Sequence, residues 1–309
     1  MLLTTSDLVT AVRRKGQIPD ASDYTDAEIL AEADDVISGR LTEAVAGLSN
    51  GFYVRYIDIT MVAGTARYAL PTRSVADTVE HVAVLQSDAT ERPLGRLRGS
   101  DAMYVAGSSG TPYHYTIEGA DLLLYPSPAV AETVRVRYQI RRAKLTAVGT
   151  NAFQITVVNA AGRRVEFVGT VPATWTTFAT ITSKLDLISR SAWSNYLDID
   201  RVVTGYVQGS PSSVTSDGTA LPSGLLVGDY VTVAGYTPVV QLPDELHAAL
   251  ANATAAAILG QRGFAEGMKT LDAFAARDIE AYRRMAAQRV KNAPVPFINR
   301  NSMLRLRGR

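Results

Sequence analysis

The chain has 309 residues, a net charge of +1 and no cysteine. Its content of 47% hydrophobic and 20% charged residues is typical of a globular protein, and the lack of cysteine excludes disulfides and cysteine metal sites. No apolar run approaches the about 20 residues of a membrane span. The first residues also lack the basic and apolar regions of a signal peptide. We therefore expect a soluble protein with no membrane partner.

The first 50 residues predict two helices. Residues 5–15 place apolar side chains on one helical face, and Gly16 is a plausible stop. Thr25 and Glu28 have the spacing of a capping box, in which each side chain bonds a free backbone N–H at the helix start. Apolar residues then recur at helical spacing, which predicts one long amphipathic helix over 26–48: Ile29, Leu30, Ala33, Val36, Ile37, Leu41, Ala44, Val45 and Leu48.

From residue 52 the period of the hydrophobic pattern changes to two, which indicates β-strands. The turn at Glu118-Gly119-Ala120-Asp121 predicts a hairpin. Short strands joined by tight turns favour an antiparallel sheet. The predicted strands are 53–60, 66–70, 78–86, 113–118, 121–125 and 133–140.

Residues 146–240 differ in composition from what precedes them. They hold both tryptophans, Trp175 and Trp193, and a loop-like stretch at 209–213. Their length of about 95 residues suits a separate domain. We interpret this segment as a second, all-β unit with predicted strands at 153–158, 164–168, 200–207 and 230–234.

The chain then returns to helix. Leu242-Pro243-Asp244-Glu245 is a helix-start pattern, because proline suits the first turn and acidic residues suit the helix dipole. The first of these helices is expected to run to Leu259, with Gly260 and Gly263 as breaks, and the second covers 265–290. Two prolines, at 294 and 296, end helical structure.

These elements predict an α+β fold. The simplest packing joins the N- and C-terminal helices into one helical bundle, beside a small antiparallel β region and an inserted all-β domain. The expected domains are a core formed by 1–145 and 241–293, the insert at 146–240, and an extended C-terminal arm at 294–309.

No motif for catalysis, for a cofactor or for a metal emerges. The histidines, His81, His114 and His247, lie on different elements without partners at metal-ligand spacing. Residues 107–110 have the wrong order for a nucleophile elbow and read as a loop. Asp198 and Asp200 would share a strand face, and we interpret them as solvated surface acids. We expect no enzyme, although an enzyme of unrecognised type stays an alternative.

The C-terminal arm departs most from the rest of the chain. No acidic residue follows Glu280, but eight basic residues do, so the first 280 residues carry a net charge of −7. Apolar and basic side chains interleave in the arm, which favours docking in a protein groove over a solvated terminus or a DNA-binding tail. The candidate docking residues are Phe297, Arg300, Leu304, Arg305, Leu306, Arg307 and Arg309.

Several segments resemble a known family. YTDAEIL at 24–30, GTPYHY at 110–115 with LLLYPSP at 122–128, RVRY at 135–138 and LPDELHAAL at 242–250 are similar to the portal-proximal head-to-tail adaptor, or connector, proteins of tailed bacteriophages. The resemblance covers about 1–145 and 241–295. Residues 146–240 have no counterpart in simple adaptors.

This resemblance implies a structural virion protein that forms a ring, usually of 12 subunits, between portal and tail. The ring would complete the DNA channel, serve DNA ejection and provide the tail attachment site. Implied partners are the portal protein, neighbouring subunits and a downstream tail or nozzle protein, with DNA only as passing cargo and assembly in the host cytoplasm. The helices 26–48 and 265–290 would form the ring wall, and the arm would reach the portal. The alternative is a carbohydrate- or receptor-binding tail module, with Trp175 and Trp193 of the insert as a stacking platform.

Overall fold

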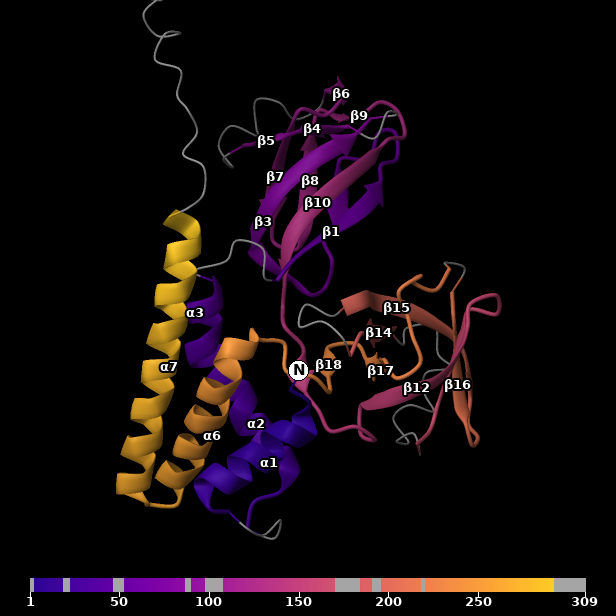
Figure 1. The fold of residues 1–309 in the computed structure, drawn as a ribbon. Coiled ribbons are helices and arrows are strands. Elements are labelled where there is room, and N and C mark those ends of the chain that lie inside the picture. The colour runs from indigo at the N-terminus through magenta and orange to yellow at the C-terminus, as the bar shows by residue number, and fades with distance from the viewer. Residues whose placement is uncertain are drawn as a thin grey trace, which may run out of the picture. The chain divides into compact units, whose positions relative to one another are not determined.

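The computed structural model (Figure 1) describes residues 3–18, 23–46, 53–86, 90–97, 108–169, 184–190, 196–217 and 220–291. The chain divides into two compact units. One is Met1–Asp7 with Asn50–Gln241, and the other is Leu8–Ser49 with Leu242–Arg309. Strands fill the first unit and helices fill the second, so the predicted α+β class is confirmed.

The helical unit begins with α1 (Thr5–Gly16), whose first turn belongs to the other unit. The predicted long helix follows as a continuous helical run in three parts. They are α2 (Asp26–Val36), a π-helical segment (Ile37–Leu41) and α3 (Thr42–Ala46). The π-helical segment was not predicted, because a single wider turn leaves the apolar spacing of its neighbours nearly unchanged.

The start of α2 is the predicted capping box. The backbone N–H of Glu28 donates to the Thr25 hydroxyl at 3.3 Å, and the backbone N–H of Thr25 donates to the Glu28 carboxylate at 2.7 Å. Two N–H groups that the helix itself cannot satisfy thereby gain partners. The helix buries one apolar face, formed by Ile29, Leu30, Ala33 and Val36 and continued by Ile37 and Leu41.

The C-terminal helices follow Pro243. A 3₁₀ turn (Asp244–Leu246) leads into α6 (His247–Gln261), and α7 (Ala265–Lys291) packs along α6. The predicted break at Gly260 was wrong, because the helix continues through it to Gln261, and Gly263 follows with a φ of +80°. A Cβ at Gly260 would lie 2.8 Å from the Met268 sulfur, so glycine here permits the close approach of α7.

Two sheets form the first part of the other unit. One has the order β1 (Val54–Thr60), β10 (Thr133–Ile140), β3 (Ser74–Leu85), β4 (Glu91–Pro93). The second has the order β2 (Arg67–Ala69), β8 (Asp121–Tyr125), β7 (His114–Glu118), β5 (Gly95–Arg96). Neighbours are antiparallel except β5 and β7. The predicted hairpin joins β7 to β8, with Gly119 at a φ of +61°.

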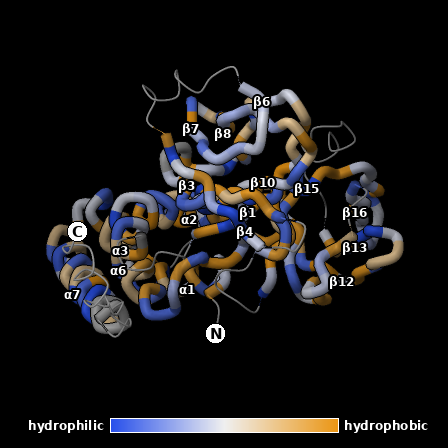
Figure 2. The backbone as a smooth tube through the Cα atoms, turned by 90° about the horizontal axis from the view of Figure 1, so that it is seen from above, coloured by the Kyte–Doolittle hydropathy of each residue, from blue (hydrophilic) through white to orange (hydrophobic). Residues whose placement is uncertain are grey.

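The two sheets share one hydrophobic core. In β10 every second residue is buried. Figure 2 shows hydrophobic and hydrophilic residues mixed along the strands of this unit. Buried side chains from both sheets meet in a single cluster, so the sheets pack with their apolar faces together. The cluster includes Tyr68, Val82, Val84, Tyr115, Leu122, Leu124, Val134, Val136, Tyr138 and Ile140.

The all-β segment is a closed six-stranded barrel. Its strand order is β12 (Ala152–Asn159), β13 (Arg164–Phe167), β16 (Ser212–Ser216), β15 (Tyr196–Val207), β14 (Lys184–Ile188), β17 (Tyr230–Val233). Its core holds Phe153 and Phe167, whose ring centres are 5.0 Å apart. The interpretation of 209–213 as a loop was wrong in its last two residues, because Ser212 and Ser213 begin β16, which pairs with both β13 and β15.

The chain enters and leaves the barrel side by side. Just before the barrel, β11 (Lys144–Leu145) pairs in parallel with β18 (Tyr236–Thr237), which follows the last barrel strand. The hydroxyl of Thr5 donates to the backbone oxygen of Thr146 at 2.9 Å and ties the start of the chain to this pair. The two ends of the barrel segment are therefore adjacent, as they are where one domain is inserted into another.

Candidate functional site

The residues predicted to dock lie outside the described residues. They are Phe297, Arg300, Leu304, Arg305, Leu306, Arg307 and Arg309. The structure describes the helix that precedes them, α7, to its end at Lys291.

Helix α7 has a buried side and an exposed apolar side. Ala275 and Tyr282 are buried, whereas the side chains of Phe274 and Met285 are 43% and 45% exposed. The guanidinium carbon of Arg277 lies 5.4 Å from the centre of the Phe274 ring, a cation–π contact at the surface. An exposed apolar strip on an otherwise charged helix is a candidate contact surface, and its use as a ring wall stays a prediction.

The π-helical segment is joined to α7 by an ion pair between Arg40 and Asp272. Single π-helical turns occur frequently at functional sites. Gly39, next to Arg40, has no atom within 4 Å of the place where a Cβ would stand, so this turn faces open space.

A groove of about 470 Å³ lies beside this ion pair, between α2 with its π-helical extension, α6 and α7. Its apolar floor contains Ala253, Ala256 and Ala257, together with Val36 and Met268. The groove is open because the side chains of α6 that line it are small. The charged rim is formed by Glu32, Asp35, Arg40, Lys269 and Asp272.

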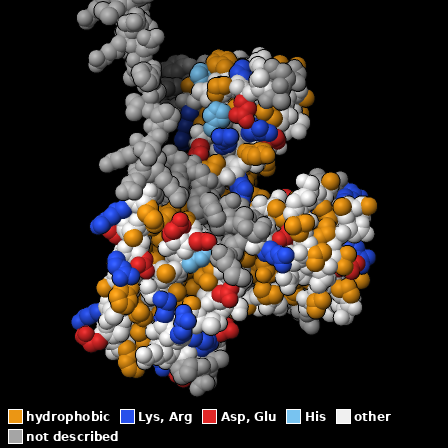
Figure 3. Space-filling view, in the orientation of Figure 1, with side chains coloured by type: hydrophobic (Ala, Val, Ile, Leu, Met, Phe, Trp, Pro, Cys, Tyr) orange, Lys and Arg blue, Asp and Glu red, His pale blue; other side chains and the backbone are white. Residues whose placement is uncertain are grey.

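The rim of the groove has an acidic surplus. Arg40 and Asp272 neutralise each other, and Lys269 lies 3.5 Å from Glu266 of the same helix. Glu32 accepts a hydrogen bond from the amide of Gln261 at 2.9 Å, which leaves its charge uncompensated. Asp35 is exposed and has no hydrogen-bond or ion-pair partner among the described residues. Figure 3 shows such charged side chains interspersed over the visible face of the helical unit.

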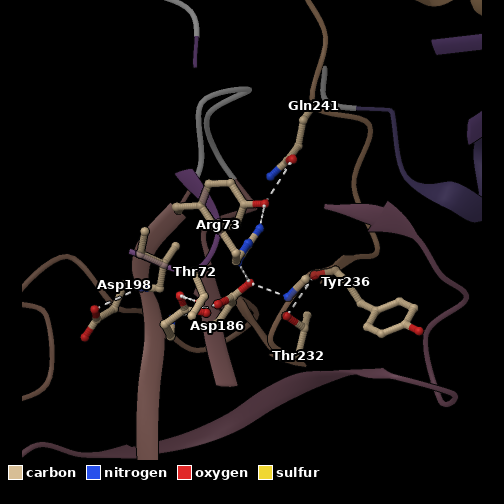
Figure 4. Close-up of polar contacts among 11 residues, drawn as sticks. Thr72, Arg73, Asp186, Asp198, Thr232, Tyr236 and Gln241 are labelled. Carbon is tan, nitrogen blue, oxygen red and sulfur yellow. Dashed lines mark hydrogen bonds and ion pairs between the residues drawn. The ribbon is translucent and has the colours of Figure 1, made fainter. Parts of the chain in front are cut away.

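In the β unit, a buried polar cluster joins the sheets to the barrel (Figure 4). Arg73, just before β3, pairs with the carboxylate of Asp186 on β14 and donates to the hydroxyl of Tyr196 on β15 at 2.7 Å. The Tyr196 hydroxyl donates in turn to the side-chain oxygen of Gln241 at 3.2 Å. Backbone N–H groups of Asp200 and Gly235 also donate to Asp186, each at 3.0 Å.

Burial sets the protonation equilibria in this cluster. The Asp186 side chain is 0% exposed, and its loss of hydration raises the pKa of its carboxyl, while Arg73 and the two backbone N–H groups oppose that rise. Burial likewise raises the pKa of the Tyr196 hydroxyl, which stays a donor to Gln241. The cluster is arranged to hold two parts of the β unit in one geometry.

Sequence reasoning missed this cluster. Arg73 and Asp186 are 113 positions apart, and no local pattern marks either of them. A hint existed only in β14, where the sequence KLDLI places a single acidic residue inside an apolar strand. A charge at such a position needs a buried partner, but the sequence does not say which residue supplies it.

The histidines do not gather into a site. His81 lies on β3, His114 on β7, and the Nε2 of His247 donates to the backbone oxygen of Leu242 at 3.1 Å. Burial lowers the pKa of His247. Over the described ranges, no three histidine, aspartate or glutamate side chains are close enough to share a metal ion. None of the described helices combines the length and apolar character needed to cross a bilayer.

The expectation that Asp198 and Asp200 share one strand face was wrong, although both acids are partly exposed to solvent as expected. Asp198 pairs at 2.7 Å with Arg201, whose side chain is only 3% exposed. Asp200 has a φ of +54°, which breaks the strand alternation, and it accepts from the Thr72 hydroxyl at 3.3 Å. Asp198 and Asp200 therefore stabilise the local structure through separate partners and do not form a pair of catalytic acids.

Two other sequence features are partly described. Ser109–Gly110 is not loop but a short strand, β6, paired with β9 (Ser127–Pro128), and Gly107 lies outside the described residues. Both tryptophans of the proposed stacking platform, Trp175 and Trp193, also lie outside the described residues.

Comparison with known proteins gives one family. A family model described as SU10 adaptor protein matches residues 3–161. The matched range takes in α1, the capped α2, both sheets and the first barrel strand. No curated protein matches the chain.

Proposed function

Because the chain belongs to the SU10 adaptor protein family, whose members are structural phage proteins, we propose that it forms a ring between portal and tail of the virion. In this proposal the ring completes the DNA channel and gives the tail its attachment site. The family match over more than half of the chain is the observation that carries the proposal. The role is one of binding without turnover.

Ring formation requires that one face of each subunit match the opposite face of its neighbour. We assign one such face to the exposed apolar strip of α7 around Phe274 and Met285. The capped helical run from Asp26 to Ala46 supplies the second wall, and the helices of both chain ends form the bundle that carries them. Twelve copies are the number that the family resemblance implies.

The barrel is proposed to be a domain inserted into the adaptor core. Its entry strand β11 and exit strand β18 lie side by side, so the core can close without it. The buried Arg73–Asp186 pair then holds the insert against the sheets.

The carbohydrate- or receptor-binding alternative has no supporting observation among the described residues. The described phenylalanines of the barrel, Phe153 and Phe167, are fully buried against each other. A stacking platform needs aromatic faces open to solvent. That alternative therefore stays a prediction that rests on the two tryptophans.

The C-terminal arm is proposed to dock on the portal. The test is to delete residues 294–309 and to measure by sedimentation how much protein joins isolated portal rings. The expected result is a folded protein that no longer joins them, and full occupancy by the truncated protein would contradict the proposal.

Two further variants separate a protein groove from DNA. One replaces Arg300, Arg305, Arg307 and Arg309 by glutamine, and the other replaces Phe297, Leu304 and Leu306 by serine. A protein groove requires both sets of side chains, so both variants should lose portal binding. A DNA-binding tail would lose DNA affinity only in the glutamine variant, with a steep dependence on salt.

A further inference from the structure

The groove between α2, α6 and α7 offers a surface without an assigned partner. Its floor is apolar and small, with Ala253, Ala256 and Ala257 from α6. Its rim carries the uncompensated carboxylates of Glu32 and Asp35. Such a surface suits an extended segment that combines apolar side chains with positive charge.

The chain itself contains a segment of that kind. Residues 294–309 have no acidic residue and four arginines, at 300, 305, 307 and 309, which interleave with Phe297, Ile298, Met303, Leu304 and Leu306. The first 280 residues carry a net charge of −7, so the arm is attracted to the body of the protein as a whole and to an acidic rim in particular.

The length of the chain permits the arm to reach this groove in the same subunit. Asp272, on the rim, lies 19 residues before the end of α7 at Lys291, which corresponds to about 30 Å of helix. Residues 292–302 can span up to about 37 Å when extended. The segment from Ser302 onward can therefore return along α7 and lie in the groove.

A second groove of the helical unit fits the arm less well. It has about 420 Å³ and is lined by Lys15, Leu259, Phe264, Glu266 and Leu271, among others. Its lysine opposes its glutamate, and the adjoining surface hollow is lined by Arg13 and Arg14. Arg13 is paired with Asp26, so this second groove carries no acidic surplus, and a basic segment is attracted more strongly to the groove next to Asp35.

We propose that in the free protein the end of the arm, residues 302–309, lies in the α2–α6–α7 groove of its own subunit. Its arginines face Glu32 and Asp35, and its apolar side chains cover the alanine floor. An arm held in this way is unavailable to another partner, so the contact is autoinhibitory. The proposal concerns the free chain and does not depend on the identity of the partner that later receives the arm.

The test uses the full chain and two spin labels. The chain has no cysteine, so Gly39→Cys and Ser302→Cys can carry the labels alone. Residue 39 is a suitable position because an added Cβ there meets no atom within 4 Å. Pulsed electron paramagnetic resonance should give a narrow distance distribution, centred below the about 30 Å that separates Asp272 from Lys291 along α7. A broad distribution would overturn the proposal.

Charge reversal at the rim supplies the matched comparison. Asp35→Arg should abolish the short distance, whereas Glu43→Arg, the same change at an exposed site of α3 away from the groove, should leave it unchanged. Ala257→Lys places a long side chain on the floor of the groove and should also abolish the short distance. This variant replaces Asp35→Arg in the test if Asp35→Arg does not fold. The proposal would be overturned if Glu43→Arg abolished the short distance, or if both groove variants retained it. So would a short distance in a mixture of singly labelled chains, because the arm would then lie on a second copy.

Discussion

Arg73 donates a hydrogen bond to the hydroxyl of Tyr196 at 2.7 Å, although the two residues are 123 positions apart in the chain. Arg73 precedes a strand of the sheets, and Tyr196 begins a strand of the barrel. The guanidinium carbon also lies 5.1 Å from the centre of the tyrosine ring. One arginine side chain therefore contacts the barrel through a hydrogen bond, a ring face and the Asp186 carboxylate.

Replacing Arg73 by methionine should destabilise the β unit strongly. Asp186 is 0% exposed and would lose its only cationic partner in this cluster, and breaking a buried pair costs about 3–5 kcal/mol. Urea denaturation monitored by tyrosine fluorescence measures the change in the free energy of unfolding. As a control, Arg141→Met changes the same residue type at an exposed position and should have an effect within about 0.5 kcal/mol.

The double variant Arg73→Met/Asp186→Asn separates the loss of the pair from the cost of an unpaired charge. It should recover part of the stability that Arg73→Met loses, because no uncompensated carboxylate remains. If the double variant were less stable than Arg73→Met, the loss of stability in Arg73→Met would not come from an unpaired Asp186 carboxylate.

Removing the hydroxyl of Thr25 should weaken the start of α2. The Glu28 backbone N–H loses its acceptor in Thr25→Ala, and loss of such a cap costs about 1 kcal/mol. Thr25→Ser keeps the hydroxyl and is the matched control. Thermal unfolding followed by circular dichroism compares the two, and equal melting temperatures would show that the cap contributes nothing.

Acid should destabilise the helical unit through His247. Burial lowers the pKa of His247 in the folded protein below its usual value of about 6.5, so the unfolded chain binds the proton more tightly. The stabilisation is complete above pH 6.5 and is lost as the pH falls below that value. His247→Gln keeps a donor for the Leu242 oxygen but cannot titrate, so its melting temperature should fall less between pH 7.5 and 5.5. An equal fall in both proteins would contradict the assignment.

Charge on the exposed strip of α7 should prevent ring closure while the subunit stays folded. Phe274 is 43% exposed, so Phe274→Glu has little effect on the fold but places a carboxylate in the proposed subunit contact. Val227→Glu, at an apolar residue that is 56% exposed in the turn before β17, is the control. Analytical ultracentrifugation of the portal-bound assemblies counts the copies. Complete rings with Phe274→Glu would show that the strip is not part of the wall.

The sequence predicts elements well where one local pattern decides the structure. Thr25 and Glu28 mark the start of α2 because a capping box needs only neighbours in the chain. Alternation in β10 predicts a strand because one of its faces is buried against the opposing sheet. The glycine at 119 marks a turn because its positive φ is part of the hairpin.

Elements that depend on distant partners were missed. Residues 184–188 of β14 are mostly buried and therefore lack alternation. Ser212 and Ser213 look like loop but are buried between two neighbouring strands. Gly260 looks like a helix stop but is the contact point of α7. The groove at Asp35 is equally non-local, because three helices from both ends of the chain line it.

The most direct test of the adaptor account is electron cryomicroscopy of the full chain bound to its portal. The account predicts a closed ring on the tail-facing side of the portal, with α7 at the contact between neighbours and residues 302–309 released from their own groove into the portal. A portal that carries no ring of this chain would contradict it, as would a ring in which residues 294–309 make no contact with the portal.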